Sequence, residues 1–201
     1  REEEFTIGGA RQGLQGWLKV GFKADGSMSA MDMYCISDNG GKGGGGDANS
    51  AAAGVSALYQ TEAMRFRNTS IGTNTGHRGA QRGPGENQIM AVMAPIMDKA
   101  AESLGLDRLE IRKLNAAQNG DVSGPRSTPF TSAYMPEALE QGAAQFDWEG
   151  KKSRARQTNG SKVRGFGIGQ GYHNAGRSGM DGIIRLMPSG RLQIHNGVGN
   201  L

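Results

Sequence analysis

Apolar and polar residues alternate over the first third of the chain, which is the pattern of strands that bury one face. Residues 17–22 alternate in this way, residues 24–27 read Ala-Asp-Gly-Ser, and residues 28–36 alternate again. Because Asp-Gly is a strong turn signal, these segments predict a β-hairpin. After it, the Ala-rich residues 50–58 predict a short helix and residues 59–71 predict an extended segment.

The middle of the chain has the spacing of a helix. Apolar residues recur there at i, i+3, i+4 and i+7, which places them on one helix face. These positions are Ile89, Val92, Met93, Ile96, Met97, Ala100 and Leu104. Methionines in such a stripe are typical of a core and not of a metal site. Pro95 lies inside the pattern and predicts a kink or a local break, and Gly105 predicts the helix end.

Two shorter helices are predicted after this one. Asp107 and Glu110 have the spacing of a capping box that begins a helix over residues 108–117. Residues 119–132 read as a loop, and Pro136 suits the first turn of a third helix. The apolar positions of that helix are Ala138, Leu139, Ala143 and Phe146.

The last part of the chain returns to strand patterns. Residues 162–172 predict a strand with glycine at the alternate positions 165, 167, 169 and 171. No helical pattern follows these glycines, so a dinucleotide-binding loop is not indicated. Glycines on one face of a strand instead predict that another element packs closely against that face. Residues 183–187 and 192–195 flank the turn Pro188–Gly190 and predict a second hairpin.

Strands and helices are therefore segregated, which indicates an α+β fold in which β-hairpins flank a helical middle section. We divide the 201 residues into a mainly β part (1–75), a part with a glycine-rich loop and helices (76–160) and a mainly β part (161–201). The chain starts at Arg1 and stops after an unfinished strand pattern, so we interpret it as an internal fragment of a larger domain. Open strand edges would then make the isolated piece aggregate or remain partly disordered.

The composition excludes several classes of protein. The net charge is +4 and the pI is near 9.4, but basic and acidic residues are interleaved. The densest basic run, residues 151–156, lacks aromatic neighbours for base stacking, so we interpret it as a solvated helix end and expect no nucleic-acid partner. Cys35 is the one cysteine, which excludes an internal disulfide or a cysteine-ligated cluster. No apolar run is long enough to cross a membrane. The compartment stays open between cytoplasm and periplasm.

Most candidate sites lack the spacing that their chemistry needs. His77, His173 and His195 are far apart in sequence and form no metal-binding pair. No Gly-x-Ser-x-Gly motif marks a hydrolase nucleophile. Residues 38–46 are rich in glycine but have no correctly spaced P-loop lysine, so they predict a surface loop and not a phosphate site.

One segment combines several features of a binding loop. Residues 73–88 contain four glycines and two arginines and lead directly into the long middle helix. Glycines let main-chain N–H groups approach a ligand, Pro84 restricts the loop, and the helix adds its positive end. This arrangement favours an anionic ligand. The residues alone fit a second interpretation equally well, a tight buried turn in which Arg82 pairs with a carboxylate.

The same segment resembles a known motif. Thr-Asn-Thr-Gly-His-Arg-Gly-Ala-Gln-Arg-Gly-Pro-Gly-Glu-Asn-Gln at 73–88 is similar to the signature Thr-Asn-x-Pro-x-x-Gly-Ala-x-Arg-Gly-x-Gly-x-x-Gln. That signature belongs to the large subunit of molybdenum hydroxylases, the xanthine dehydrogenase and aldehyde oxidase family. Residues 8–12 and 19–26 upstream, and 104–115 and 165–169 downstream, resemble other segments of this family in the same order.

The resemblance implies a set of site residues within part of the molybdopterin-binding domain. The implied cofactor-binding residues are Ala80, Gln81, Arg82 and Gly83. Arg82 is expected beside the molybdenum without ligating it through the side chain. The implied substrate-pocket residues are Pro84, Gly85, Tyr172 and His173. The family's general-base glutamate is expected beyond Leu201, so no catalytic residue is expected within these residues and the fragment alone should be inactive.

The implied reaction is the hydroxylation of an aldehyde or N-heterocycle with oxygen from water. The implied cofactor of this subunit is molybdenum with molybdopterin, or with its cytosine dinucleotide form. Iron–sulfur clusters and FAD are expected on partner subunits or domains.

Two departures from the family argue against xanthine as substrate. Residues 49–53 read Asn-Ser-Ala-Ala-Ala where purine-oxidising members have an arginine, and Pro84 replaces a phenylalanine that stacks on substrate. The unusual Pro-Gly-Glu-Asn variation and the missing active-site elements leave an alternative, a non-catalytic structural or assembly homologue.

Overall fold

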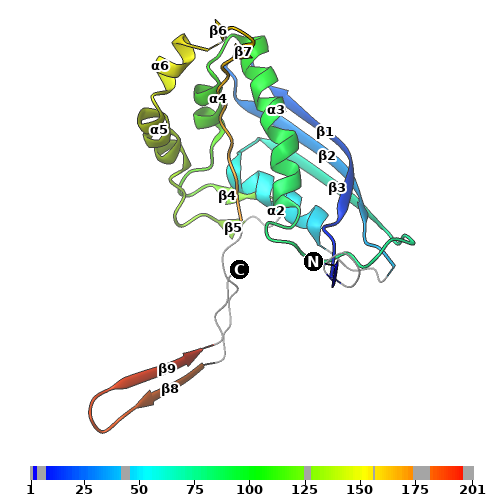
Figure 1. The fold of residues 1–201 in the computed structure, drawn as a ribbon, viewed down its shortest axis with the longest axis vertical. Helices are drawn as coiled ribbons and strands as arrows, with labels where there is room; N and C mark the ends of the chain where they lie inside the picture. The colour runs from blue at the N-terminus through cyan, green and yellow to red at the C-terminus, as the bar shows by residue number, and fades with distance from the viewer. Residues whose placement is uncertain are drawn as a thin grey trace.

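The main body of the protein is a three-stranded sheet with helices over one face (Figure 1). The computed structural model describes residues 2–3, 8–41, 46–124, 128–155, 157–173 and 182–196. In the sheet, β1 (Gly13–Phe22) pairs antiparallel with β2 (Met28–Asp38), and β2 pairs in parallel with β3 (Ala63–Ile71).

The β1–β2 connection confirms the predicted hairpin. Its turn is closed by Asp25, whose Oδ1 accepts hydrogen bonds from the N–H of Ser27 at 2.8 Å and from its hydroxyl at 2.6 Å. Gly26 adopts φ 90°, a conformation that other residues rarely take. Trp17 of β1 then lies opposite Tyr34 of β2, on the sheet face away from the helices.

The predicted short helix is also confirmed. α2 (Asp47–Leu58) connects β2 to β3, and a parallel pair needs such a crossover because its strands cannot be joined by a tight turn. The glycine-rich segment before α2 is less exposed than predicted. Asn39 and Gly40 are buried, and a Cβ on Gly40 would come within 2.3 Å of the Gly76 carbonyl oxygen. The surface-loop prediction is therefore wrong at these two residues, and residues 42–45 lie outside the described part.

The long middle helix α3 (Glu86–Leu104) runs through Pro95 without a break (Figure 1). The expected local break is absent because Met93 and Met97, on either side of the proline, are both fully buried and hold the two halves on one core. Gly105 ends the helix in the left-handed conformation at φ 68°, as the sequence predicts.

Three shorter helices follow: the first two confirm the predicted ones, although the first ends at Asn115 and not at residue 117, and the third was not predicted. They are α4 (Arg108–Asn115), α5 (Met135–Phe146) and α6 (Trp148–Ser153). Asp107 caps α4 by accepting a hydrogen bond from the Leu109 N–H at 2.7 Å. Between α4 and α5 the predicted loop contains a short hairpin, β4 (Val122–Ser123) with β5 (Thr128–Pro129).

The main core lies between the sheet and the two helices α2 and α3. From Met31 onward alternate side chains of β2 enter it, and both helices contribute a buried stripe. The core residues of these three elements are Met28, Met31, Met33, Cys35, Ala48, Ala51, Val55, Leu58, Ile89, Met93, Met97 and Ala101. A smaller cluster joins Leu109, Leu139 and Trp148 from α4, α5 and α6.

The predicted strand over residues 162–172 is wrong for most of its length. Only β7 (Lys162–Val163) pairs, with β6 (Thr158–Asn159), and residues 164–173 follow without strand pairing among the described residues. The predicted close packing on its glycines is also absent. A Cβ added at position 165, 167, 169 or 171 would meet no atom within 4 Å.

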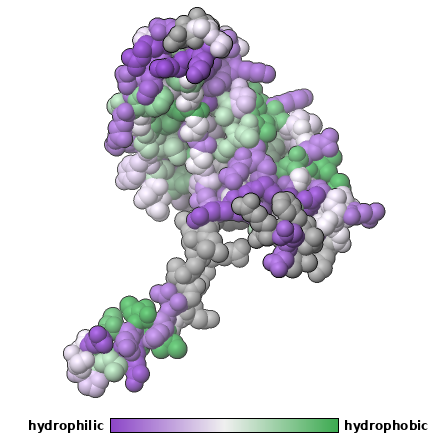
Figure 2. All heavy atoms as spheres, viewed as in Figure 1, coloured by the Kyte–Doolittle hydropathy of each residue, from purple (hydrophilic) through white to green (hydrophobic). Residues whose placement is uncertain are grey.

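The last predicted hairpin is confirmed, and it lies apart from the body (Figure 1). It consists of β8 (Gly182–Leu186) and β9 (Leu192–Asn196). Its apolar side chains are exposed by 55% to 72%, and Figure 2 shows them on the surface. These residues are Ile183, Ile184, Leu186, Leu192 and Ile194. The pair therefore has no apolar partner among the described residues.

Candidate functional site

The segment that carries the signature, residues 73–85, lies beside residues 8–12. The Ala10 N–H donates to the His77 carbonyl at 3.1 Å, and the Gly79 N–H donates to the Ala10 carbonyl at 2.9 Å. The Gln81 amide donates to the Gly9 carbonyl at 2.5 Å. A Cβ on Gly9 would lie 3.3 Å from the Gly79 backbone, so this close approach favours glycine. Two segments far apart in sequence are therefore joined by an isolated parallel bridge between Ala10 and Arg78.

Arg11 fixes the end of this loop. Its guanidinium donates to the Arg82 carbonyl at 2.7 Å, to the Gly83 carbonyl at 2.9 Å and to the Gln88 amide oxygen at 3.3 Å. A planar guanidinium has several donors in a fixed geometry, so one side chain orients two consecutive peptide groups. The main chain of the loop is thereby positioned before any ligand binds.

The side chain of Arg82, unlike that of Arg11, does not hold the loop. Arg82 is exposed, and its guanidinium makes no hydrogen bond or ion pair with the residues that the structure describes. The buried-turn interpretation, in which Arg82 pairs with a carboxylate, is therefore wrong within this part of the chain. Arg78 makes that kind of pair instead, at 3.2 Å from Asp38.

Asp38 ties the start of the loop to the end of β2. Its Oδ1 accepts hydrogen bonds from the Thr73 hydroxyl at 2.6 Å and from the Gly40 N–H at 2.9 Å. These two hydrogen bonds, with the positive charge of Arg78, hold the pKa of the Asp38 carboxyl below its usual value. The loop is thus fastened by a carboxylate at its start and by a guanidinium at its end.

Two glycines shape the turn into α3. Gly83 has φ 70° and Gly85 has φ 78°, and both are buried. A Cβ on Gly85 would lie 1.7 Å from the Asp47 carbonyl oxygen, so the loop docks on the first turn of α2. Gly85 is therefore required both by its backbone conformation and by the space available.

A buried polar network lies beneath the loop. Asp47 is 2% exposed, and its Oδ2 accepts from the Gln88 amide at 3.4 Å, while its N–H donates to Gln12 Oε1 at 3.2 Å. Gln12 also donates to Asn39. Burial raises the pKa of the Asp47 carboxyl, although the hydrogen bond from Gln88 and the charge of Arg11 oppose the shift.

The second predicted part of the site, Tyr172 and His173, reaches the same helix start. His173 Nδ1 lies 2.8 Å from Glu86 Oε2, and Glu86 is the first residue of α3, directly after Gly85. Tyr172 packs on the main core. The Tyr59 hydroxyl donates to Gln170 Oε1 at 2.7 Å, and burial raises the pKa of Tyr59 to about 12. The structure therefore brings the segment that ends at His173 to the end of the loop.

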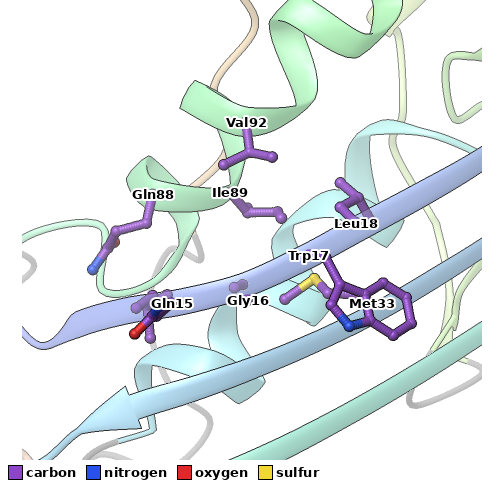
Figure 3. A pocket seen from close by; sticks show the side chains of 10 residues that line it. Gln15, Gly16, Trp17, Leu18, Met33, Gln88, Ile89 and Val92 are labelled. Carbon is purple, nitrogen blue, oxygen red and sulfur yellow. The ribbon is translucent and has the colours of Figure 1, made fainter.

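A separate apolar cleft of about 190 Å³ lies between β1 and α3 (Figure 3). Ile89 and Val92 extend from α3 toward β1, and Gly16 of β1 also lines the cleft. Gln88 lines this cleft and also belongs to the polar network. None of the predicted pocket residues lines it, so it is distinct from the substrate pocket predicted at residues 84–85 and 172–173.

The structure thus relates most of the predicted site residues to one another. Ala80, Gln81, Arg82, Gly83, Pro84 and Gly85 are consecutive in the loop, and His173 contacts the residue that follows them. Their roles in binding stay predictions. Sequence reasoning gave no role to Asp47 or Glu86, because no motif marks a carboxylate that becomes buried only through tertiary contacts. Arg11 lies within residues 8–12, which resemble the family, and this resemblance was the one sequence signal that could have pointed to it.

Two further findings concern the described residues only. They contain no group of three or more His, Cys, Asp or Glu side chains that could hold a metal ion. None of their helices is both long enough and apolar enough to span a bilayer.

Comparisons with known proteins agree on one family. The model of the "Molybdopterin cofactor-binding domain" family matches residues 1–116. The chain is 31% identical over 170 residues to the xanthine dehydrogenase molybdenum-binding subunit of Escherichia coli O157:H7, which covers 84% of the chain and 23% of that relative. It is 28% identical over 200 residues to the aldehyde oxidoreductase of Megalodesulfovibrio gigas, covering 97% of the chain and 22% of that protein.

The solved structure of the aldehyde oxidoreductase from Desulfovibrio gigas has a similar fold. The TM-score is 0.78 at 26% identity, over 93% of this chain and 21% of that one. The chain therefore spans between a fifth and a quarter of the length of these relatives.

Proposed function

This chain belongs to the family of molybdopterin cofactor-binding domains, and on that premise we propose that it forms part of a catalytic molybdenum subunit. The resemblance to xanthine dehydrogenase and aldehyde oxidoreductase subunits is confirmed, and so is the α+β fold as part of such a domain. The proposed activity of the full-length subunit is the hydroxylation of an aldehyde or an N-heterocycle.

The observation that carries this proposal is the loop that Arg11 fixes at Arg82 and Gly83. The carbonyls of Arg82 and Gly83 accept hydrogen bonds from the Arg11 guanidinium at 2.7 and 2.9 Å, while the Arg82 guanidinium is exposed. A preorganised loop with an exposed cation suits an oxygen-rich anionic group, because little conformational freedom is lost on binding. Molybdopterin carries a phosphate, so the residues present fit this cofactor.

Each proposed site residue has a physical role in binding. Ala80, Gln81, Arg82 and Gly83 would hold the molybdenum cofactor, with the Arg82 guanidinium donating hydrogen bonds to its anionic oxygens. Pro84 and Gly85 would form one wall of the substrate pocket, and Tyr172 and His173 would form another. When bound, the cofactor supplies two-electron oxidation with oxygen from water. The chain's own residues would bind the cofactor, orient the substrate and enclose the pocket.

The substrate class follows from the small side chains near the loop. The Ala-rich start of α2 and the proline at 84 provide neither an arginine nor an aromatic ring for a purine. An aldehyde or another heterocycle is therefore the proposed substrate. The proposed electron acceptors are iron–sulfur clusters and FAD on partner subunits or domains. The cytosine dinucleotide form of molybdopterin is part of the same proposal.

The proposal is tested with the full-length subunit and its partners, produced in cells that make molybdopterin. We expect dye reduction with benzaldehyde or quinoline, and ¹⁸O from labelled water in the product. A preparation that contains molybdenum but oxidises no member of an aldehyde and heterocycle panel would reject the proposed activity. Xanthine oxidation as the main activity would reject the substrate assignment.

The alternative of a non-catalytic homologue is not favoured. Its basis was the Pro-Gly-Glu-Asn variation in the signature, yet the turn at these residues is fully anchored by Arg11 and by the contact of Gly85 with α2. The longer reading frame separates the two hypotheses. A catalytic subunit should contain a Gly-Gln motif and a late glutamate in a glycine-rich context.

A further inference from the structure

The carboxylate of Glu86 lies where three segments of the chain meet. It occupies the first position of α3, immediately after the Gly85 turn, and the residue is 4% exposed. Its Oε2 lies 2.8 Å from His173 Nδ1. Its Cγ faces Gly54 of α2, where an added Cβ would come within 3.1 Å. Glu86 therefore contacts both α2 and His173, and it directly follows the last residue of the loop.

This location suits a carboxylate that accepts a hydrogen bond. The N-terminal end of a helix stabilises negative charge, and because an ionised carboxylate can only accept, we assign the tautomer of His173 that carries its proton on Nδ1 and donates it to Glu86. A hydrogen bond to a buried charged acceptor contributes more than one at the surface. Gly54 leaves the space that the Glu86 side chain occupies, so the position of the carboxylate depends on α2 as well as on α3.

The segment before His173 is attached to the body through side chains, and Phe166 and Ile168 pack on the smaller cluster. Phe166 packs edge-to-face on Trp148 with 4.7 Å between ring centroids, and Gln170 bonds to Tyr59. Residues 164–173 have no strand pairing among the described residues, and their four glycines leave the backbone unusually free. Tyr172 packs on the main core, and the hydrogen bond between His173 and Glu86 joins the segment to the residue directly after the loop.

We propose that Glu86 is a positioning residue, which holds the Tyr172–His173 wall at a fixed distance from the loop residues Arg82–Gly85. The inference rests on the proposed function for its consequence, because these two walls would face the same substrate. It assigns Glu86 no contact with the substrate or the cofactor. Its effect passes through His173, whose imidazole is the group that Glu86 fixes.

The test compares Glu86→Ala, Glu86→Gln and His173→Ala in the full-length subunit. We expect Glu86→Ala to raise KM about tenfold with a smaller change in kcat and with unchanged molybdenum content, since small misplacements of binding groups are costly. Glu86→Gln should restore KM, because its amide oxygen still accepts from His173. The double variant Glu86→Ala/His173→Ala should be no worse than His173→Ala. Glu102→Ala, an exposed glutamate of the same helix, is the matched control.

Gly54→Ala perturbs the same carboxylate without removing it. The added methyl should displace the Glu86 side chain by a few tenths of an ångström and raise KM in the same direction as Glu86→Ala. If Glu86→Ala and Gly54→Ala both leave KM unchanged, or if Glu86→Gln is as damaging as Glu86→Ala, the inference is overturned.

A second readout needs neither cofactor nor substrate. Amide hydrogen exchange of residues 165–173 in the cofactor-free subunit should become faster in Glu86→Ala, stay near wild type in Glu86→Gln and be unaffected in Glu102→Ala. Unchanged exchange in Glu86→Ala overturns the inference even if the enzyme is active. A wild type without molybdenum instead rejects the proposed function, while the exchange result still decides whether Glu86 holds this segment.

Discussion

The guanidinium of Arg11 and the carbonyl of Arg82 lie 2.7 Å apart, although the two residues are 71 positions apart in sequence. The two arginines therefore have different structural roles. Arg11 fixes the main chain of the loop, and the side chain of Arg82 remains exposed. A mutation of each should therefore have a different signature.

Arg11→Ala should lower both stability and molybdenum content. The substitution removes the guanidinium that donates hydrogen bonds to two loop carbonyls and to the Gln88 amide oxygen. A hydrogen bond to a charged group contributes about 1.5–3 kcal/mol. Because Arg11 is only half-buried, we expect a loss of about 1–3 kcal/mol in total for the three bonds. Chemical denaturation of the full-length subunit measures the loss. Arg164→Ala, which removes an exposed arginine, is the control. Equal stability of both variants would show that Arg11 does not hold the loop.

Gly85→Ala should be among the most damaging single methyl additions in the chain. The residue has φ 78°, and the new Cβ would lie 1.7 Å from the Asp47 carbonyl oxygen. Strain and overpacking each cost about 1–3 kcal/mol. Gly142→Ala, in the middle of α5, adds the same methyl where no atom lies within 4 Å. It should stabilise by about 0.5–1 kcal/mol. The free energies of unfolding of the two variants should therefore change in opposite directions.

Asp38 should stabilise the protein more at neutral pH than in acid. Its pKa is lowered in the folded state by Thr73, Gly40 and Arg78, so the unfolded chain binds the proton more tightly. The stabilisation is complete above the unfolded pKa and is lost as pH falls through the lower folded value. Asp38→Asn should thus be less stable than wild type at pH 7, and the two should converge in strong acid. A difference that is constant with pH would contradict this.

Asp47 should show the opposite pH dependence. Burial raises its folded pKa, so the folded state binds the proton more tightly than the unfolded state. The favourable contribution is present below the unfolded pKa and is lost as pH rises through the folded pKa. Relative to wild type, Asp47→Asn should therefore gain stability between acid and neutral pH. Urea unfolding of both proteins across this range measures the change, and a relative loss would mean that the charge is compensated.

The regular elements were largely predictable because their signals are local. The Asp-Gly turn at residues 25–26, the apolar stripe of α3 and Gly105 act within a few residues of the chain. Residues 164–172 were mispredicted because alternation permits a strand, whereas a strand forms only with a partner. The pairing of residues 8–12 with the loop is non-local and carries no propensity signal.

The candidate site was predictable in part for the same reason. Arg82 and its neighbours are consecutive in a recognisable motif, so their proximity needed no tertiary information. Glu86 and Asp47 look like ordinary helix-start carboxylates in the sequence. They become site residues only because His173, Gln88 and Arg11 approach them from other segments.

The central claim is that the exposed Arg82 side chain serves the molybdenum cofactor, and metal content tests it most directly. Molybdenum should be measured by elemental analysis in the full-length wild type, Arg82→Ala and Arg164→Ala, made in parallel in cells that supply the cofactor. We predict molybdenum in the wild type and in Arg164→Ala. Arg82→Ala should bind it about tenfold more weakly at unchanged thermal stability, since its guanidinium has no partner among the described residues. A wild type without molybdenum, or an Arg82→Ala that retains as much as Arg164→Ala, would contradict the claim.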